Sequence, residues 1–350
     1  MIYFITTAGN TQTISSFFNT WGKKLKKQIR LIPYEKLLRC KTISSGTYFF
    51  CDLDLLNDEQ LKFARSFYLE LKKYPESYRM LNEPVISANR VQLLDKLFQE
   101  KINSFRCVSL TEIPDDLQFP VFIRHGIDHS GKISKIIYDN NEMKIIINRA
   151  INQGLPKDEI FITEFVDTAI DGKIYKKYSA FVLGDTILPR HIFYSNDWMI
   201  KRADLTSKKI VDEEFEYIIN NPHKEFLRKV AKTANIDYGR IDYSMKDNQP
   251  VIWEINPNPM IASSSSLKKP QRKKIHEFFV SRFIASLEKI DIKLKDKTLP
   301  NPLFESELFN ENMQEIFPFN DIEYHITTRY KSYKFILLYY FYSLRNIFKN

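Results

Sequence analysis

Apolar and polar residues alternate along two neighbouring stretches of the chain, residues 239–245 and 251–257, as they do in strands with one buried face. The apolar residues of the two stretches are Ile241, Tyr243 and Met245 in the first, and Val251, Trp253 and Ile255 in the second. The polar residues, which share the opposite face, are Arg240, Asp242 and Ser244, then Glu254 and Asn256. Residues 246–250, Lys-Asp-Asn-Gln-Pro, are typical of a turn. The pattern predicts a β-hairpin.

This hairpin brings two carboxylates together. If it is centred on Asn248, Asp242 lies opposite Glu254, with Cβ atoms roughly 5 Å apart. Such a pair repels by roughly 4 kcal/mol at an effective dielectric constant near 20, and a divalent cation turns that repulsion into attraction. Asn256 adds a carbonyl oxygen, which completes an oxygen ligand set suited to Mg²⁺, and Arg240 can hold an anion beside the metal. The alternative is a solvated hairpin face that carries charges.

Periodicity elsewhere predicts further strands and helices. In the first part of the chain we expect, in order, a strand at 2–6, a helix at 13–26, a strand at 46–53 and a helix capped by Asn57 and Gln60. This alternation indicates a parallel sheet. Later we expect a helix at 90–105, strands at 119–124 and 161–167, a hairpin of 175–183 with 186–193, a helix beginning at Asn221-Pro222, and a helix at 275–287.

Composition describes a folded protein. The 350 residues are 43% hydrophobic and 27% charged, which is enough for two or three domains with their own cores. The three cysteines have no C-x-x-C spacing, no basic leader precedes the first strand, and no apolar run approaches the roughly 20 residues of a membrane span, so we expect a cytoplasmic protein. The net charge of +9 suits an enzyme that handles nucleotides and carboxylates. Nucleic-acid binding motifs are absent from the sequence, so we expect no nucleic-acid partner.

The Arg-x-Asp strand, the turn and the second strand ending Glu-Ile-Asn-Pro-x-Pro resemble the metal-binding end of ATP-grasp enzymes. The resemblance implies ATP and Mg²⁺ as cofactors. It implies that Asp242, Glu254 and Asn256 are metal ligands, and that Arg240 is a catalytic residue that contacts the phosphate or the acyl-phosphate intermediate.

The order of segments from residue 89 to residue 261 is similar to that of the same family, which implies a set of nucleotide-binding residues. They are a base near the helix at 90–105, a base in the strand at 119–124 and the Gly-containing loop after it, the adenine-binding hinge, a ribose-binding acid and a base in the second hairpin. The residues are, in that order, Arg90, Arg124, Gly126, Ser130, Gly131, Glu164, Phe165, Val166, Asp171 and Lys176. Asp167 is the alternative to Asp171, and Lys177 is the alternative to Lys176. Arg124 stands where the family usually has Lys, which puts the catalytic geometry in doubt.

The resemblance implies an α/β (α+β) fold of four parts. They are an N-terminal small parallel α/β domain (1–88), the ATP-grasp small lobe (89–160), the large lobe with the metal site (161–262), both with antiparallel sheets, and a helical C-terminal extension (263–350). It also implies an ATP-dependent ligase that activates a carboxylate as an acyl phosphate and joins it to an amine, or less often a thiol, with small-molecule or peptide substrates. A phosphotransferase on the same scaffold and a nucleotide-binding module with little catalysis remain alternatives.

The end of the chain carries the run 335–342, in which all eight residues are apolar or aromatic and bases flank the run. Such a segment packs on its own protein, forms a contact in a homodimer, or lies on an anionic membrane. We favour packing on the same protein or a homodimer contact, because exposed apolar patches of this size are uncommon.

Overall fold

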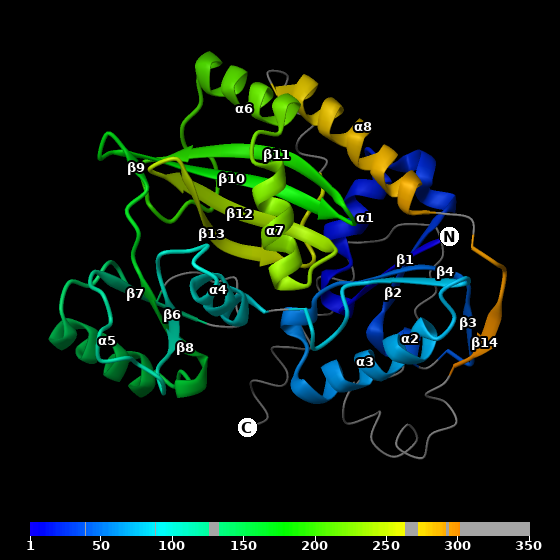
Figure 1. Ribbon diagram of the computed structural model, residues 1–350, viewed down its shortest axis with the longest axis horizontal. Helices are drawn as coiled ribbons and strands as arrows, with labels where there is room; N and C mark the ends of the chain where they lie inside the picture. The colour runs from blue at the N-terminus through cyan, green and yellow to red at the C-terminus, as the bar shows by residue number, and fades with distance from the viewer. Residues whose placement is uncertain (39, 88, 126–132, 263–271, 292–293, 302–350) are drawn as a thin grey trace. The chain divides into compact units, whose positions relative to one another are not determined.

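The structure is a computed structural model that describes residues 1–38, 40–87, 89–125, 133–262, 272–291 and 294–301. All of these residues lie in one of the two units into which the chain divides, Met1–Ile316. The parallel and antiparallel sheets expected from the sequence are both present (Figure 1), which confirms the mixed α/β fold. The proposed boundaries near residues 88, 160 and 262 stay predictions.

The N-terminal strands form a parallel sheet in the order β2-β1-β4-β5. Their bounds are β1 Ile2–Thr6, β2 Ile29–Pro33, β4 Gly46–Phe50 and β5 Tyr78–Leu81. Parallel strands need crossovers, and those here contain helices α1 Gln12–Asn19, α2 Tyr34–Leu38 and α3 Asp58–Lys72. The predicted capping box of Asn57 and Gln60 begins α3. The helix predicted to reach residue 26 ends at Asn19, because the N–H groups of Thr20 and Gly22 both turn back to the Phe17 carbonyl oxygen.

A second, antiparallel sheet has the order β6-β8-β7, with β6 Cys107–Ser109, β7 Val121–His125 and β8 Ile160–Glu164. Helix α5 Asn140–Asn152 packs on it through Met143 and Ile147. Helix α4 Arg90–Gln99 precedes it and stops before the predicted end at residue 105, since Lys101 adopts a left-handed conformation with φ of 56°. The face that α4 buries is Leu93, Leu94 and Leu97.

The third sheet carries the predicted hairpins in the order β11-β10-β12-β13, with the short strand β9 Ala169–Ile170 beside β10. The bounds are β10 Ile174–Leu183, β11 Thr186–Ser195, β12 Tyr238–Lys246 and β13 Gln249–Asn256. Helices α6 Lys208–Asn220 and α7 Lys224–Ala234 cover one face. Asn221 was predicted to begin a helix, but it ends α6 in a left-handed conformation, and α7 begins three residues later.

Within the C-terminal extension, α8 Lys273–Ile290 is the predicted helix, and β14 Thr298–Pro300 pairs antiparallel with β3 Thr42–Ser44. Phe279 and Phe283 of α8 share a core with Phe4 and Phe17 of the N-terminal region and Phe181 of β10. The run 335–342 lies outside the described residues. In the part of the chain that is described, the helices lack the combination of length and apolarity that crossing a membrane requires.

Candidate functional site: an opposed carboxylate pair among partly buried cations

The hairpin of β12 and β13 turns through only two residues. Lys246 pairs with Gln249, and the residues between them, Asp247 and Asn248, have φ values of 49° and 61°. Positive φ at both central residues is the geometry of a type I′ turn, which Asn and Asp tolerate. The turn is therefore shorter than the five residues predicted from the sequence, and its centre lies between Asp247 and Asn248.

A bulge in β13 restores the predicted carboxylate pairing. Tyr243 pairs with Ile252, but Asp242 pairs with Glu254, so Trp253 is the extra residue of the bulge. The bulge also corrects the predicted faces: Ile252 and Ile255 pack with Tyr243 under α6 and α7, whereas Val251 and Trp253 pack in a separate cluster. Indole Nε1 of Trp253 donates to Ser244 Oγ.

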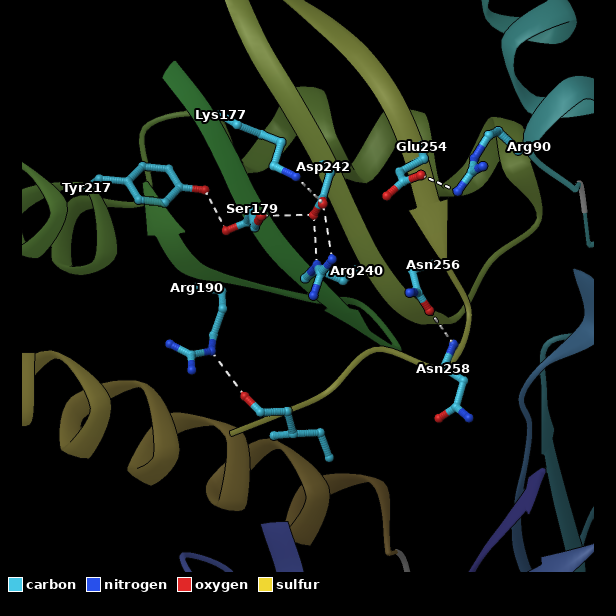
Figure 2. A network of polar contacts seen from close by, with 11 residues as sticks. Arg90, Lys177, Ser179, Arg190, Tyr217, Arg240, Asp242, Glu254, Asn256 and Asn258 are labelled. Atoms are coloured by element: carbon cyan, nitrogen blue, oxygen red, sulfur yellow. Dashed lines mark hydrogen bonds and ion pairs between the residues drawn. The ribbon is translucent and has the colours of Figure 1, made fainter. Parts of the chain in front are cut away.

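Asp242 is the most heavily bonded side chain of the site. Its carboxylate accepts from Arg240 through Nε at 2.7 Å and Nη2 at 3.0 Å, and from Ser179 Oγ at 2.8 Å, and Lys177 Nζ lies 3.3 Å away (Figure 2). The side chain is buried, and burial alone raises a carboxyl pKa. The cations Arg240 and Lys177 outweigh that effect and hold the pKa of Asp242 well below its usual range. Asp242 is therefore ionised.

Glu254 is held by a different helix. Arg90, the first residue of α4, forms an ion pair with its carboxylate (Figure 2). Burial and the neighbouring Asp242 raise the pKa of Glu254. The cations Arg90, Lys177 and Arg124 together lower it by more, so the net pKa is below the ordinary value. Burial and Arg90 lower the pKa of Arg124, and Glu254 raises it. Among the described residues, no hydrogen bond or ion pair engages the Arg124 guanidinium.

Asn256 lies at the end of β13, where it pairs with Arg240. Its Oδ1 accepts from the backbone N–H of Asn258 at 2.8 Å, which fixes the amide and leaves a second lone pair on that oxygen. The residues thus fit a magnesium ion, because two ionised carboxylates and an amide supply hard oxygen donors. Within the described ranges no three His, Cys, Asp or Glu side chains lie close enough together to hold a metal ion by themselves. The donor set therefore suits an ion that also takes oxygens from a bound ligand and water.

The two lysines of β10 point to different surroundings. Lys176 donates to Glu213 of α6 at 2.6 Å, on the face away from the carboxylate pair. Lys177 lies against Asp242. The structure therefore brings Lys177 to the site and leaves Lys176 outside it, which reverses the preference expressed from the sequence.

The hinge residues predicted to bind adenine lie at the end of β8 and beyond it. The Glu164 carboxylate accepts from Arg106 and from the backbone N–H of Gln118, so it ties three segments together. The rings of Phe165 and Trp198 meet edge-on, with their centroids 5.3 Å apart. Val166 packs in the same apolar cluster as Trp253 and Leu94 of α4.

The predicted ribose-binding acids differ in their partners. Asp171 is exposed, with φ of 52°, between β9 and β10. Asp167 accepts from the Ala169 N–H. The loop residues Gly126, Ser130 and Gly131 lie outside the described residues.

Sequence reasoning singled out neither Ser179, which donates to Asp242, nor Arg190, a buried cation of β11. Alternation along β10 places Ser179 on the same face as Lys177, and this signal was available. Arg190 is the extra residue of a bulge in β11, since Ser179 pairs with His191 and Ala180 pairs with Pro189. Its Nε donates to the Ile261 carbonyl oxygen at 3.0 Å, and burial lowers the pKa of its guanidinium to about 10. No pattern in the sequence announces a bulge at this position.

A cavity of about 550 Å³ lies between the segment 110–119 and helix α5, and its lining mixes apolar residues such as Leu117 and Met143 with the charged residues Asp115 and Lys144. It shares no lining residue with the carboxylate site, so we do not assign it to the same chemistry.

Comparison with known proteins shows what the chain is similar to. No family model matches the sequence. The chain is 26% identical over 169 residues to the carbamoyl phosphate synthase large chain of Saccharolobus islandicus, a match that covers 47% of this chain and 16% of that relative. The match thus spans about a sixth of the relative's length. Such relatives are ATP-grasp proteins, so the predicted resemblance to that family is confirmed.

Two solved structures align with most of this chain at low sequence identity. D-alanine–D-alanine ligase from Bacillus anthracis complexed with ATP is 16% identical, covers 82% of this chain and 97% of its own, and has a TM-score of 0.45. The RimK domain protein ATP-grasp from Sphaerobacter thermophilus is 10% identical, covers 81% of this chain and 100% of its own, and also has a TM-score of 0.45.

Proposed function

We propose that this ATP-grasp-like protein is an ATP-dependent ligase that activates a carboxylate as an acyl phosphate and joins it to an amine. The balance of charge in the site carries the proposal. Among the described residues, two ionised carboxylates lie with four cations around them: Arg90, Arg124, Lys177 and Arg240. These cations are partly buried, and charges withdrawn from water are normally paired, so this excess of positive charge favours a polyphosphate ligand. A magnesium ion would arrive with that ligand.

The residues divide into two groups by chemistry. Asp242, Glu254 and Asn256 supply oxygen donors that would hold Mg²⁺, and the bound ion would neutralise charge on the phosphate oxygens. Arg240 presents a planar guanidinium to the same space. It would stabilise the negative charge of the transferring phosphoryl group and then that of the tetrahedral intermediate. Arg124 would bind the α and β phosphates.

The reaction has two steps. A carboxylate oxygen of the first substrate forms a bond to the γ-phosphorus, the bond from that phosphorus to the bridging oxygen breaks, and ADP leaves. The amine nitrogen of the second substrate then attacks the carbonyl carbon. The bond from that carbon to the phosphate oxygen breaks, inorganic phosphate leaves, and the amine proton passes to solvent. Asp242 is buried, and exclusion of water around it in the complex with substrates would protect the acyl phosphate from hydrolysis.

We propose small-molecule or peptide carboxylates and amines as the substrates. The test is an ATP-turnover assay in which panels of acids and amines are supplied separately and together. Release of ADP and phosphate that requires both substrates supports the ligase. A phosphorylated product with no phosphate release would instead indicate a phosphotransferase. Magnesium-dependent nucleotide binding without turnover on any panel would indicate a binding module.

A further inference from the structure

The carboxyl ends of three parallel strands meet at one edge of the N-terminal sheet, and a polar side chain follows each of them. Thr7 follows β1, Asp52 follows β4 and Asn82 follows β5. In open α/β sheets this edge usually faces a ligand. Here its polar groups bond to the two open ends of the β12–β13 hairpin.

Asp52 is an unusual residue for a buried turn. It is 2% exposed and adopts a left-handed conformation with φ of 54°, which residues other than Gly rarely do. Its carboxylate accepts from the backbone N–H of Thr7 at 2.8 Å, from Thr7 Oγ1 at 3.0 Å and from Asn258 Nδ2 at 2.7 Å. Burial raises the pKa of Asp52 to about 6, since no cation pairs with it among these contacts. A charge in this position needs its hydrogen bonds.

Asn258 transmits this contact to the site. Its side-chain oxygen accepts from Thr13 Oγ1 at 2.7 Å, and its Nδ2 donates to Asp52 and, more weakly, to the Asn10 carbonyl at 3.3 Å. The N-terminal region therefore holds both ends of the Asn258 amide. The backbone N–H of the same residue donates to Asn256 Oδ1 (Figure 2). Asn256 is in turn two residues from Glu254 on the same face.

Asn82 holds the other open end of the hairpin and makes a natural comparison. Its side chain donates to the carbonyls of Phe50 and Tyr238 and accepts from the N–H groups of Asp237 and Tyr238, where β12 begins. It is fully buried and has φ of 63°. The hydrogen bonds of Asn82 stop at the start of β12, whereas those of Asp52 continue to a predicted metal ligand.

We propose that Asp52 is a positioning residue for the metal site: by fixing Asn258, it holds the Asn256 amide oxygen in place to serve as a ligand beside Glu254. The proposal rests on the proposed function, because it assumes that Asn256 binds Mg²⁺. It assigns the N-terminal region a part in metal binding, through a residue that lies about 200 positions away in sequence from the ligand it acts on.

The experiment measures nucleotide affinity by calorimetry in the full chain, with and without Mg²⁺, for wild type and Asp52→Ala. ATP binding should tighten as Mg²⁺ is added. We expect the Mg²⁺ concentration that gives half of this tightening to rise about tenfold in Asp52→Ala, as it does when a residue that holds a metal-binding side chain in place is lost. ATP affinity in EDTA should stay unchanged. Asn82→Ala is the matched control: it should lower the unfolding temperature and leave the Mg²⁺ requirement as in wild type.

A double-mutant cycle distinguishes positioning from general stability. If Asp52 acts through Asn258, Asp52→Ala combined with Asn258→Ala should raise the Mg²⁺ requirement no further than either change alone. If Asp52→Ala does not fold, Thr13→Val removes only the hydroxyl that holds the Asn258 oxygen, and it should shift the requirement in the same direction. Two results would overturn the inference and leave the proposed function standing. In the first, wild type responds to Mg²⁺, but Asp52→Ala and Thr13→Val have the same Mg²⁺ requirement as wild type. In the second, the effects of Asp52→Ala and Asn258→Ala on the Mg²⁺ requirement add up in the double variant. A wild type whose ATP affinity ignores Mg²⁺ overturns the proposed function and the inference with it.

Discussion

Asp242 lies opposite Glu254 because β13 contains one residue more than β12 at this point. The two-residue turn at Asp247 and Asn248 would by itself place Asp242 opposite Trp253. The bulge at Trp253 advances the register by one residue, and a one-residue shift exchanges the faces of a strand. Two acidic side chains therefore share one face of the sheet, and each has its own cation: Arg240 for Asp242 and Arg90 for Glu254.

The first prediction concerns this acidic pair. Asp242→Asn combined with Glu254→Gln keeps the shapes of the side chains but removes both negative charges. We expect the Mg²⁺-dependent part of ATP affinity to disappear and turnover to fall by at least about 100-fold, as for loss of charge-stabilising groups in a polar active site. Calorimetry with and without Mg²⁺ and an ADP-release assay check the two parts.

The matched control for the acidic pair is Asp247→Asn, which removes a carboxylate from the exposed turn of the same hairpin. Its left-handed backbone suits Asn, so the turn should be preserved. If the control weakens the Mg²⁺ response as much as the double variant does, the effect is one of general charge, and the role assigned to Asp242 and Glu254 is wrong.

The predicted pairing of Asp242 with Glu254 is the observed one, but only part of the reasoning behind it was right. Alternation fixed which residues of β12 share a face, and that face is the observed one. The position of the pair followed from an assumed centre at Asn248, whereas the real turn is one half-residue earlier and a bulge makes up the difference. A bulge depends on contacts from outside the hairpin. Here both backbone polar groups of Ile252 bond to the side chain of Asn103, a residue about 150 positions away.

Contacts between distant segments account for what the sequence could not predict. Arg90 was expected near phosphate because the resemblance implies a base near this helix, but nothing local indicates that it pairs with Glu254. Strands β2 and β5 were not predicted because each is short and only partly buried. They become strands through pairing with β1 and β4. Local periodicity therefore predicted the central elements of the site, and tertiary contacts determined its surroundings.

The second prediction separates the two lysines of β10. The Lys177 ammonium lies 3.3 Å from Asp242 and lowers the pKa of that carboxyl. Lys177→Met removes this cation, so ATP affinity should fall about tenfold through loss of a charge-assisted contact. Lys176→Met should change ATP affinity less than about twofold, because its ammonium group serves Glu213. Equilibrium binding with a fluorescent ATP analogue measures both. An equal loss in the two variants would mean that the face assignment has no bearing on nucleotide binding.

The third prediction is a pH effect. Arg90 lowers the pKa of Glu254, so in Arg90→Gln that pKa should rise. Glu254 then takes up its proton at a higher pH than in wild type, and the pH below which Mg²⁺-dependent ATP binding fails should move upward. Titration of the binding from pH 4 to pH 8 in wild type, Arg90→Gln and the control Lys96→Gln, another change on α4, measures the shift. An acid limit that coincides in all three would show that Arg90 does not act on Glu254.

The last prediction uses the raised pKa of Asp52 to relate stability to pH. The folded protein holds the Asp52 proton up to about pH 6, while an unfolded aspartate releases it near its ordinary value of 3.8. Between these values the folded state binds more protons, so this residue makes the protein less stable as the pH rises, by about 3 kcal/mol across the window. Asp52→Asn cannot ionise. The free energy of unfolding of this variant relative to wild type should therefore improve between pH 4 and pH 7, even if the lost hydrogen bonds lower its absolute stability. Urea unfolding at the two pH values measures the difference, and a gap between variant and wild type that stays constant would show that the Asp52 carboxylate has an ordinary pKa.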